Sequence, residues 1–464
     1  MHNKKKERKS MSEVVVGLLG FACIVAIVVT LFKSKTLPSI AFIIFPMILG
    51  AILVFGGYYS WENIGKLIKS GFSSTGPTAA LFVFSVLYFG IMTDAGMFDV
   101  IIGKLMLLVK DNVIGVCVMT CIIALIGHLD GGGASTFCIV VPAMLPVYKK
   151  MHMRPTTLLR ISVIAMGVLN LMPWAGPTMR AATVLGIEAG SLWQTILPIQ
   201  ACGIVLALAV AVLNGIIEQK RGAGLNGKLA QEATHLNSVE EAAAEAESAN
   251  NDLARPKLFV FNIILTIAVI ALLIKDIFPS YVPFMIGVAI AILVNYPGAK
   301  MQKKIINLHS GPALMMCSTL MGAAVLMGIL VKDIEGVNSV ITCMSNLISS
   351  ILPAALGQHL PLVIGILSVP LALAFDTDSY FYGMLPVMIG IGEGFGVGAM
   401  PIAVAMVVCR NCATFISPMV PATLLGVGLA DVDIKDHIKA SFGYVWIFSI
   451  LCMLFAVVLG ILPL

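Results

Sequence analysis

Charged residues are scarce in this chain. They make up 11% of its 464 residues, while apolar residues make up 59% and the mean hydropathy is +1.00. An ordinary soluble domain carries about 25% charged residues. Because a water-soluble fold cannot hide so much apolar surface, we expect the lipid bilayer to be the solvent of this protein. The net charge of +5 lies largely in the N-terminal tail and indicates no nucleic-acid partner.

Several other features are missing. The ten cysteines are scattered through apolar stretches and predict no disulfide framework. Cys409 and Cys412 have the spacing of a redox or metal pair, but packing in a buried helix is the favoured interpretation. No large soluble domain is evident, which argues against ATP-driven pumps and two-component sensors. No small-residue cleavage site follows the first apolar run, so a removable signal peptide is not expected.

The apolar segments instead repeat in order. The segments Leu37–Val54 and Phe278–Val294 both have Pro-Ser near their start and Ala-Ile-Leu-Val at their end. Later matches follow in sequence: Gly76-Pro77 with Gly311-Pro312, Asp130 with Asp376, and Asn170 with Asn411. A repeated membrane unit with polar, interrupted elements at matching places is typical of secondary transporters.

These matches predict an all-α polytopic membrane protein of two repeats, 1–217 and 258–464, joined by a polar linker over 218–257. Each repeat has about five segments long enough to cross a bilayer. Because that number is odd, the two repeats would be inverted relative to each other. Shorter amphipathic stretches at 61–70 and 96–110 are expected to form separate helices at the membrane interface.

Each repeat also contains an apolar–polar–apolar stretch, over 113–148 and 361–391. Each arm has about 15 residues, or about 22 Å of helix, which is short for a crossing. We therefore expect two re-entrant helical hairpins with polar tips near the membrane centre, where irregular backbone must line a cavity. Two ordinary crossings with a short external loop are the alternative.

The next crossing of each repeat carries helix breakers. Pro173-Trp174-Ala175-Gly176-Pro177 interrupts 156–186, and the stretch from Ser417 to Pro421 interrupts 399–429. A helix restarting near Thr178 would aim its free N–H groups at the membrane centre, where they favour an anion. Arg180 follows in the first turn and can grip a carboxylate, although an ion pair with Glu188 is the alternative. The expected substrate-binding residues are Ser135, Thr136, Gly176, Pro177, Thr178, Arg180, Ser379, Ser417 and Thr423.

Acidic residues at the two predicted tips are candidates for coupling. An ionisable group at membrane depth is costly and indicates function. Carboxylates beside exposed carbonyls suit a hard cation or a proton, although helix capping is an alternative for the aspartates. His128 could take part in proton coupling or be a packed, hydrogen-bonded histidine, and the sequence favours neither. Arg410 could likewise belong to the substrate site or form a structural ion pair. The predicted coupling-ion or proton residues are Asp130, Asp376, Asp378, Asn170 and Asn411.

Three motifs resemble the citrate–metal:proton symporter (CitMHS) family of the ion transporter superfamily: Leu129–Thr136, Asn170–Arg180 and Phe89–Gly96. The resemblance covers nearly the whole chain. It implies a homodimer in the plasma membrane, in which a scaffold holds a transport domain that moves as an elevator. It also implies inward symport of protons with citrate, usually complexed with a divalent cation such as Mg²⁺ or Ca²⁺, with Asp130 meeting the metal through the chelate. The family usually has a second acidic residue where this chain has Gly132, so the metal requirement stays open.

We therefore expect proton-coupled uptake of citrate or a related di- or tricarboxylate, and no enzyme activity. Sodium-coupled carboxylate symport is the nearest alternative. An intramembrane aspartyl protease using Asp130 and Asp376 is disfavoured, because Gly127-His128-Leu129-Asp130 lacks the second glycine that such a site needs. An anion channel, which would conduct without coupling to a proton gradient, is the third alternative.

Overall fold

The computed structural model describes residues 11–33, 35–107, 112–224, 252–275, 277–349 and 351–463. Within these ranges the regular structure is helical, and the β pairing is a single isolated bridge between Ile334 and Val337. Nine helices of the described part are long and apolar enough to cross a membrane. The fold is therefore that of an all-α, multi-pass membrane protein.

The first half of the chain forms nine α-helices and one 3-10 turn within the described residues. They are α1 (Glu13–Phe32), α2 (Pro38–Phe55), α3 (Trp61–Asp94), α4 (Met97–Met106), α5 (Val113–Gly127), the 3-10 turn η1 (His128–Asp130), α6 (Gly133–Lys150), α7 (Pro155–Leu169), α8 (Gly176–Leu185) and α9 (Ala189–Lys220).

The second half has a similar order of long and short helices, with three additional short elements, η2, α15 and η4. Its elements are η2 (Pro256–Leu258), α11 (Phe259–Lys275), α12 (Tyr281–Asn295), α13 (Ala299–Val331), α14 (Val340–Ser349), α15 (Ala354–Gln358), α16 (Leu360–Ala374), the π-helical turn η3 (Ser379–Met384), α17 (Leu385–Gly394), α18 (Ala399–Cys412), η4 (Thr414–Ile416), α19 (Pro421–Leu429) and α20 (Ile434–Val458).

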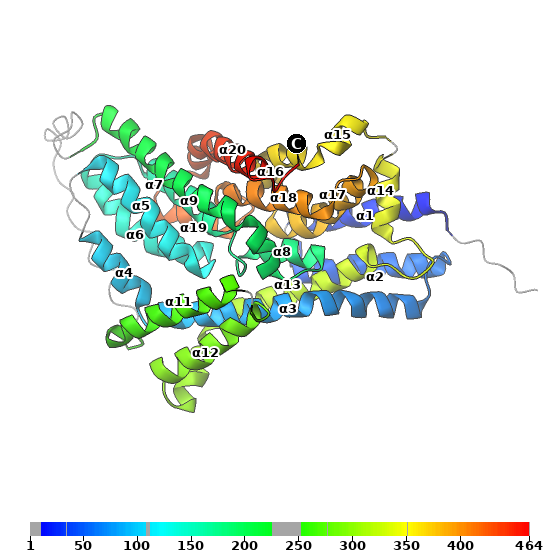
Figure 1. The fold of residues 1–464 in the computed structure, drawn as a ribbon, viewed down its shortest axis with the longest axis horizontal. Helices are drawn as coiled ribbons and strands as arrows, with labels where there is room; N and C mark the ends of the chain where they lie inside the picture. Colours follow the sequence, from blue (N-terminus) through cyan, green and yellow to red (C-terminus); the bar gives the residue numbers. More distant parts are fainter. Residues whose placement is uncertain are drawn as a thin grey trace, which may run out of the picture.

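The two longest helices, α3 and α13, pack along each other through most of their length (Figure 1). Their contact is close because glycines face it. A Cβ built on Gly71 would lie 2.0 Å from the Ala324 carbonyl oxygen, and one on Gly328 would lie 2.5 Å from the Leu67 oxygen. Small residues let membrane helices approach backbone to backbone, which maximises van der Waals contact where no hydrophobic effect operates between helices.

The prediction of a separate interfacial helix over 61–70 is wrong. Helix α3 begins at Trp61, where the Ser60 hydroxyl accepts the Asn63 N–H at 3.1 Å, and it continues unbroken to Asp94. Pro77 lies inside the helix without ending it. Long membrane helices tolerate an internal proline because neighbouring elements compensate for the one lost backbone hydrogen bond.

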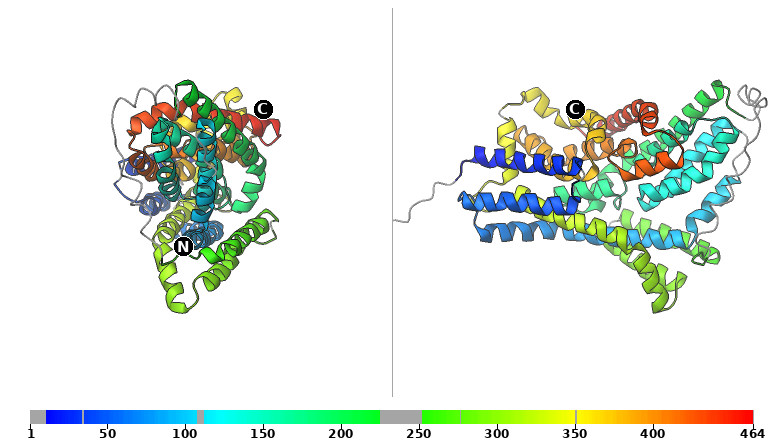
Figure 2. Two further views of the ribbon diagram at one scale, coloured as in Figure 1. Left: turned by 90° about the vertical axis from the view of Figure 1, so that its left-hand side faces the viewer. Right: turned by 180° about the vertical axis from the view of Figure 1, so that it is seen from behind.

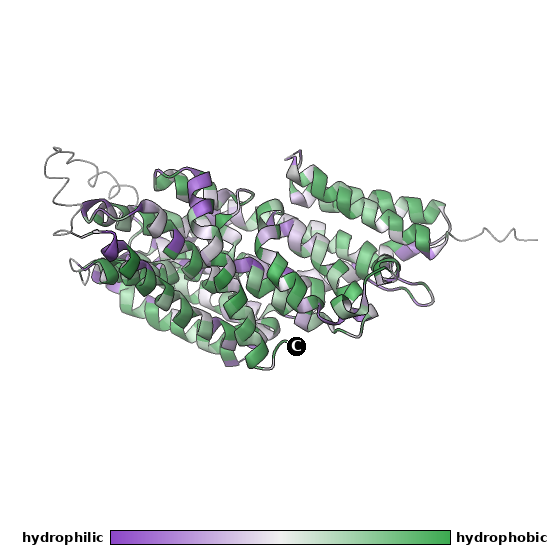
Figure 3. Cartoon of the chain, turned by 90° about the horizontal axis from the view of Figure 1, so that it is seen from above, coloured by the Kyte–Doolittle hydropathy of each residue, from purple (hydrophilic) through white to green (hydrophobic). Residues whose placement is uncertain are grey.

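Other helices lie toward the two ends of the molecule. Helices α5, α6 and α9 lie toward one end, and α14 and α17 toward the other (Figures 1 and 2). Seen from above, most residues of the long helices are hydrophobic (Figure 3), and many of their large apolar side chains are exposed. This pattern is the one expected of helices that face lipid.

Packing also crosses between the halves. Helix α6 of the first half packs against α19 of the second, and α8 of the first half packs against η3 and α17 of the second. The turns that carry the candidate site residues are thereby brought to the middle of the molecule.

Candidate functional site

Two helix breaks form the framework of the site. Helix α7 ends at Leu169 and α8 begins at Gly176, with a proline in the first turn of α8. The Thr178 hydroxyl donates to the Leu171 carbonyl at 3.0 Å and so ties the new helix to the break. In the second break, the Ser417 hydroxyl oxygen accepts the Met419 N–H at 3.2 Å. Thr178 and Ser417 therefore shape the breaks through bonds within the protein.

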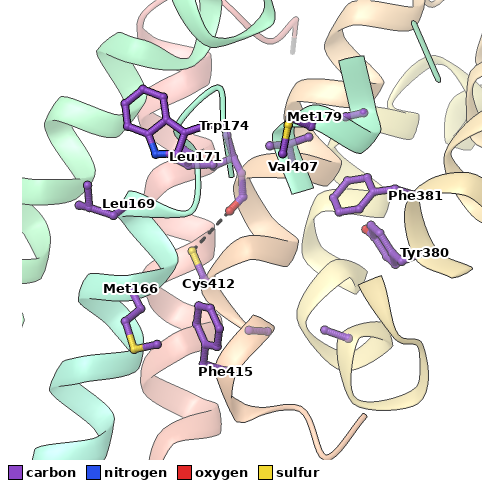
Figure 4. Packing of buried hydrophobic residues seen from close by; sticks show 14 of the residues in the cluster. Met166, Leu169, Leu171, Trp174, Met179, Tyr380, Phe381, Val407, Cys412 and Phe415 are labelled. Carbon is purple, nitrogen blue, oxygen red and sulfur yellow. Dashed lines mark hydrogen bonds between the residues drawn. The ribbon is translucent and has the colours of Figure 1, made fainter. Parts of the chain in front are cut away.

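The breaks meet at two asparagines that end α7 and α18. Asn170 donates from Nδ2 to Oδ1 of Asn411 at 3.3 Å, and Asn411 donates from Nδ2 to the Asn170 carbonyl at 3.1 Å. Both side chains are buried. A Cβ on nearby Gly167 would lie 3.0 Å from the Asn411 carbonyl oxygen, so the two helices are in backbone contact. Figure 4 shows the packing of apolar side chains between these breaks.

The first polar tip is organised by Asp130. Its Oδ1 accepts the Gly132 N–H at 2.7 Å, and its Oδ2 accepts the Ser135 hydroxyl. The Thr136 hydroxyl donates to the Gly132 carbonyl at 2.7 Å and lies 2.7 Å from Nδ1 of His128. Asp130 therefore stabilises the turn that leads into α6, and the two predicted hydroxyl donors of this tip already have partners.

Trp174, which the sequence reasoning did not place in the site, holds the first tip against the first break. Its indole Nε1 donates to the Leu129 carbonyl at 2.8 Å. Its ring packs against Phe89 of α3 and Phe284 of α12, with centroid distances of 5.4 and 5.2 Å. A tryptophan between two prolines at membrane depth was the available signal, because its N–H needs a buried acceptor.

The second tip repeats the turn of the first, in which an aspartate accepts a backbone N–H two residues later. Asp376 accepts the N–H groups of Asp378 and Ser379 on Oδ2, at 3.0 and 3.3 Å. In both tips the aspartate therefore accepts the N–H of the residue two positions later. The residue at that position differs between the tips: it is Gly132 in the first and Asp378 in the second.

Arg180 pairs with Asp378 and not with Glu188. Its Nε lies 2.5 Å from Asp378 Oδ1, with side-chain exposures of 8% and 15%. Glu188 instead accepts the backbone N–H of Ser280 at 3.2 Å. A Cβ on Gly176 would lie 2.4 Å from Nη1 of Arg180, so the guanidinium folds over the start of α8 where no side chain is in the way.

Arg410 is fully buried and bonds to neutral oxygens. It donates from Nη1 to the Thr414 hydroxyl at 2.8 Å and from Nη2 to the Phe375 carbonyl at 3.4 Å. The guanidinium also lies 5.7 Å from the ring centroid of Tyr380. These contacts join the second break to the second tip, so Arg410 positions both elements.

Several buried polar atoms around the tips and breaks lack a hydrogen-bond partner within the described residues. Arg410 Nε and Thr423 Oγ1 are two of them, and Ser379 Oγ is a third, although the carboxylate of Asp376 is close to it. His128 Nε2 and Tyr382 OH also lie outside hydrogen-bond geometry, although Asn170 and Thr183 are close to them. Buried polar groups are normally paired, so each of these atoms is available to a ligand or an ordered water.

A narrow crevice, too tight to admit a water molecule in this conformation, lies beside Arg180, where α8 and η3 face the two long helices. Gly176, Arg180 and Tyr382 line one side of it, and Phe82 of α3 and Thr319 of α13 line the other. Tyr382 was not predicted from the sequence. Among the described residues, no group of three or more His, Cys, Asp or Glu side chains could hold a metal ion.

This arrangement of long helices, interrupted helices and a central polar site is typical of membrane transporters. The fold resembles the crystal structure of the Alcanivorax borkumensis YdaH transporter with a TM-score of 0.52, at 12% identity, covering 85% of this chain and 89% of that one.

The chain belongs to the citrate transporter family, whose sequence profile matches residues 8–409. It is 32% identical to a citrate transporter of Bacillus subtilis, over 97% of this chain and all of the relative. It is also 32% identical to a Mg(2+)/citrate complex secondary transporter of the same organism, over 96% of this chain and 99% of the relative. The family resemblance seen in the sequence is confirmed, and the protein is a transporter and not an enzyme.

Proposed function

We propose that this protein is a secondary active transporter that carries citrate, or a closely related di- or tricarboxylate, across the plasma membrane together with protons. The observation that carries the proposal is the buried guanidinium of Arg180 beside a crevice, among polar atoms without partners. Two relatives whose names include citrate support the choice of substrate.

Each part of the site has a task in this proposal. Arg180 binds one substrate carboxylate through two N–H groups, and the start of α8, from Gly176 to Thr178, adds the positive end of its helix dipole. The hydroxyls of Ser379 and Thr423 donate to the substrate. Pro177, Ser135, Thr136, Thr178 and Ser417 act by holding the turns in shape, because the hydroxyls among them have partners in the protein.

The coupled protons are carried by carboxylates of the two tips, Asp130, Asp376 and Asp378. The pair of Asn170 and Asn411 keeps the two breaks in register while they bind. A co-transported Mg²⁺ or Ca²⁺ would be part of the substrate, arriving as its citrate chelate, with Asp130 as the carboxylate that meets the metal. The relative named as a Mg(2+)/citrate complex transporter supports this form of the substrate.

The transport cycle we propose is an elevator movement built on two inverted repeats. The matching order of helices in the two halves supports the repeats, with α3 and α13 having 34 and 33 residues. The scaffold comprises α2, α3, α12 and α13, and the moving domain comprises the hairpins α5–α6 and α16–α17 with the interrupted helices α7–α8 and α18–α19. Two scaffolds associate in a homodimer, with the exposed apolar faces of α11 and α12 as the contact.

The test is uptake of labelled citrate into proteoliposomes under an inward proton gradient, with and without Mg²⁺ or Ca²⁺. Arg180→Ala is expected to abolish uptake while the protein stays folded, and Arg180→Lys to retain a fraction, because a lysine keeps the charge but loses the planar fork. Normal uptake by Arg180→Ala would remove Arg180 from the site. Uptake that follows a sodium gradient at constant pH would identify sodium, instead of protons, as the coupling ion. Citrate flux that does not saturate with concentration would indicate a channel.

A further inference from the structure

The ion pair between Arg180 and Asp378 joins two elements that are far apart in the chain. Arg180 lies on α8 and Asp378 on the second tip, and their closest atoms are 2.5 Å apart. The other polar contact of the guanidinium is a long one, 3.8 Å from Nη2 to the sulfur of Met316. Asp378 is therefore the carboxylate that neutralises Arg180 in this conformation.

Arg180 of this pair lines the narrow crevice beside α8, which must widen before a substrate can bind there. Arg180 lines the crevice together with Gly176 and Tyr382. A carboxylate of the substrate that binds to Arg180 must therefore compete with the carboxylate of Asp378 for the same guanidinium. The other ionisable side chains near the pair are Asp376, Tyr382 and Arg410.

The chain contains this pair once and not in both halves. Arg180 follows Pro177 by three residues at the start of α8, whereas Leu424 follows Pro421 by three residues at the start of α19. The partner position of the first tip is likewise uncharged, because Gly132 corresponds there to Asp378. Both members of the pair are thus missing together from the other half, as expected if they work as a unit.

We propose that Asp378 is an exchangeable counter-ion, which neutralises Arg180 when the transporter is empty and is displaced by a carboxylate of the substrate. The proposal rests on the transport of a carboxylate proposed above. It gives Asp378 a role that differs from that of Asp376 and Asp130, which accept backbone N–H groups of their own tips.

The displacement links substrate to a proton. When a substrate carboxylate takes over Arg180, the carboxylate of Asp378 is left in a buried place without its counter-charge, which is costly. Asp378 then takes up one proton from the side to which the site is open. When the substrate leaves on the other side, Arg180 pairs with Asp378 again and the proton is released there, so that one proton crosses with each substrate through this residue.

The same exchange allows the empty transporter to return. A buried arginine without a partner resists movement through the membrane interior, whereas a neutral pair does not. Replacing Asp378 by asparagine should leave Arg180 able to hold the substrate, because asparagine imitates the protonated carboxylate. It should prevent the empty transporter from moving, because nothing then neutralises Arg180.

The experiment compares two modes of transport in proteoliposomes containing Asp378→Asn. Exchange of external labelled citrate for internal unlabelled citrate requires only the loaded form to move, while net uptake also requires the empty form. We expect exchange to persist and net uptake to fall by roughly 100-fold or more, the effect of leaving one buried charge unpaired. The matched control is Glu62→Gln, which removes a carboxylate from an exposed pair with Lys66, 2.7 Å apart on α3, and should change neither mode.

A second measurement uses the wild-type protein and does not depend on the variant. Calorimetric titration with citrate at about pH 8, where all citrate carboxylates are ionised, in two buffers of different ionisation enthalpy, reports protons taken up on binding. We expect about one proton fewer per citrate in Asp378→Asn than in the wild type.

The outcomes separate the two proposals. Net uptake by Asp378→Asn equal to that of the wild type, loss of exchange together with net uptake in folded variant, or binding to the wild type without proton uptake would each overturn the exchangeable counter-ion. Absence of citrate binding and transport by the wild type itself would instead overturn the proposed function.

Discussion

The glycine contact between α3 and α13 gives a quantitative prediction about the scaffold. Replacing Gly71 by alanine places a Cβ 2.0 Å from the Ala324 carbonyl oxygen, 3.0 Å from its carbonyl carbon and 3.1 Å from the Gly328 nitrogen. The atoms in the way are backbone, so no side chain can rotate to make room. Because carbon atoms hardly ever approach an oxygen within about 3 Å, the helices must separate locally by about 1 Å.

The cost of this separation follows from packing. Overfilling a close-packed contact destabilises a protein by about 1–3 kcal/mol, and this case falls near the upper end because the backbone itself must move. In an unfolding equilibrium that energy is a factor of roughly 5 to 150. The intrinsic preference of alanine over glycine in a helix, about 1 kcal/mol, acts in the opposite direction.

The matched control is on the same helix. Gly76→Ala adds the same methyl group where nothing lies within 4 Å, so it should be neutral or slightly stabilising. The assay is equilibrium unfolding in detergent, monitored by circular dichroism or by the loss of a monodisperse peak on gel filtration. Equal stability of Gly71→Ala and Gly76→Ala would refute the close helix contact.

Two further predictions concern the polar centre. Asn411→Ala removes both hydrogen bonds to Asn170 and leaves a buried amide and carbonyl without partners, which should destabilise the protein by about 2–4 kcal/mol in the same unfolding assay; unchanged stability would contradict the buried pair. Gly426→Ala places a Cβ 2.7 Å from the ring of Phe137, whereas Gly428→Ala meets nothing within 4 Å. We expect only Gly426→Ala to loosen α19 from α6, with a loss of about 1–3 kcal/mol and a lower rate of citrate uptake, and equal uptake rates for both variants would argue against that contact.

Much of the architecture could be predicted from composition and order alone. The scarcity of charge predicted a membrane protein, and the structure has nine helices of spanning length in its described part. The two prolines and the glycine of 173–177 lie where α7 gives way to α8, because a proline removes a hydrogen bond wherever the rest of the chain goes. The motifs around Asp130 and Arg180 led to the family to which the chain belongs.

The pairing of charges could not be predicted in the same way. Sequence distance favoured Glu188, eight residues from Arg180, yet the partner is Asp378, 198 residues away. Likewise, a row of hydroxyl groups predicted many substrate donors, and the structure gives Ser135, Thr136 and Thr178 partners within the protein. Whether a given hydroxyl group stays without a hydrogen-bond partner depends on residues that are distant in the sequence and meet only in the folded chain.

Local chemistry therefore determined where this chain enters apolar surroundings, where its helices break and which residues can carry charge there. These properties depend on each residue and its immediate neighbours, and the sequence contains them fully. Tertiary structure decided which broken helix meets which tip, because α8 packs on η3 and α19 packs on α6 across the two halves. Contacts between distant segments depend on the shape of both partners, so the pair of Arg180 and Asp378 became visible only in the folded protein.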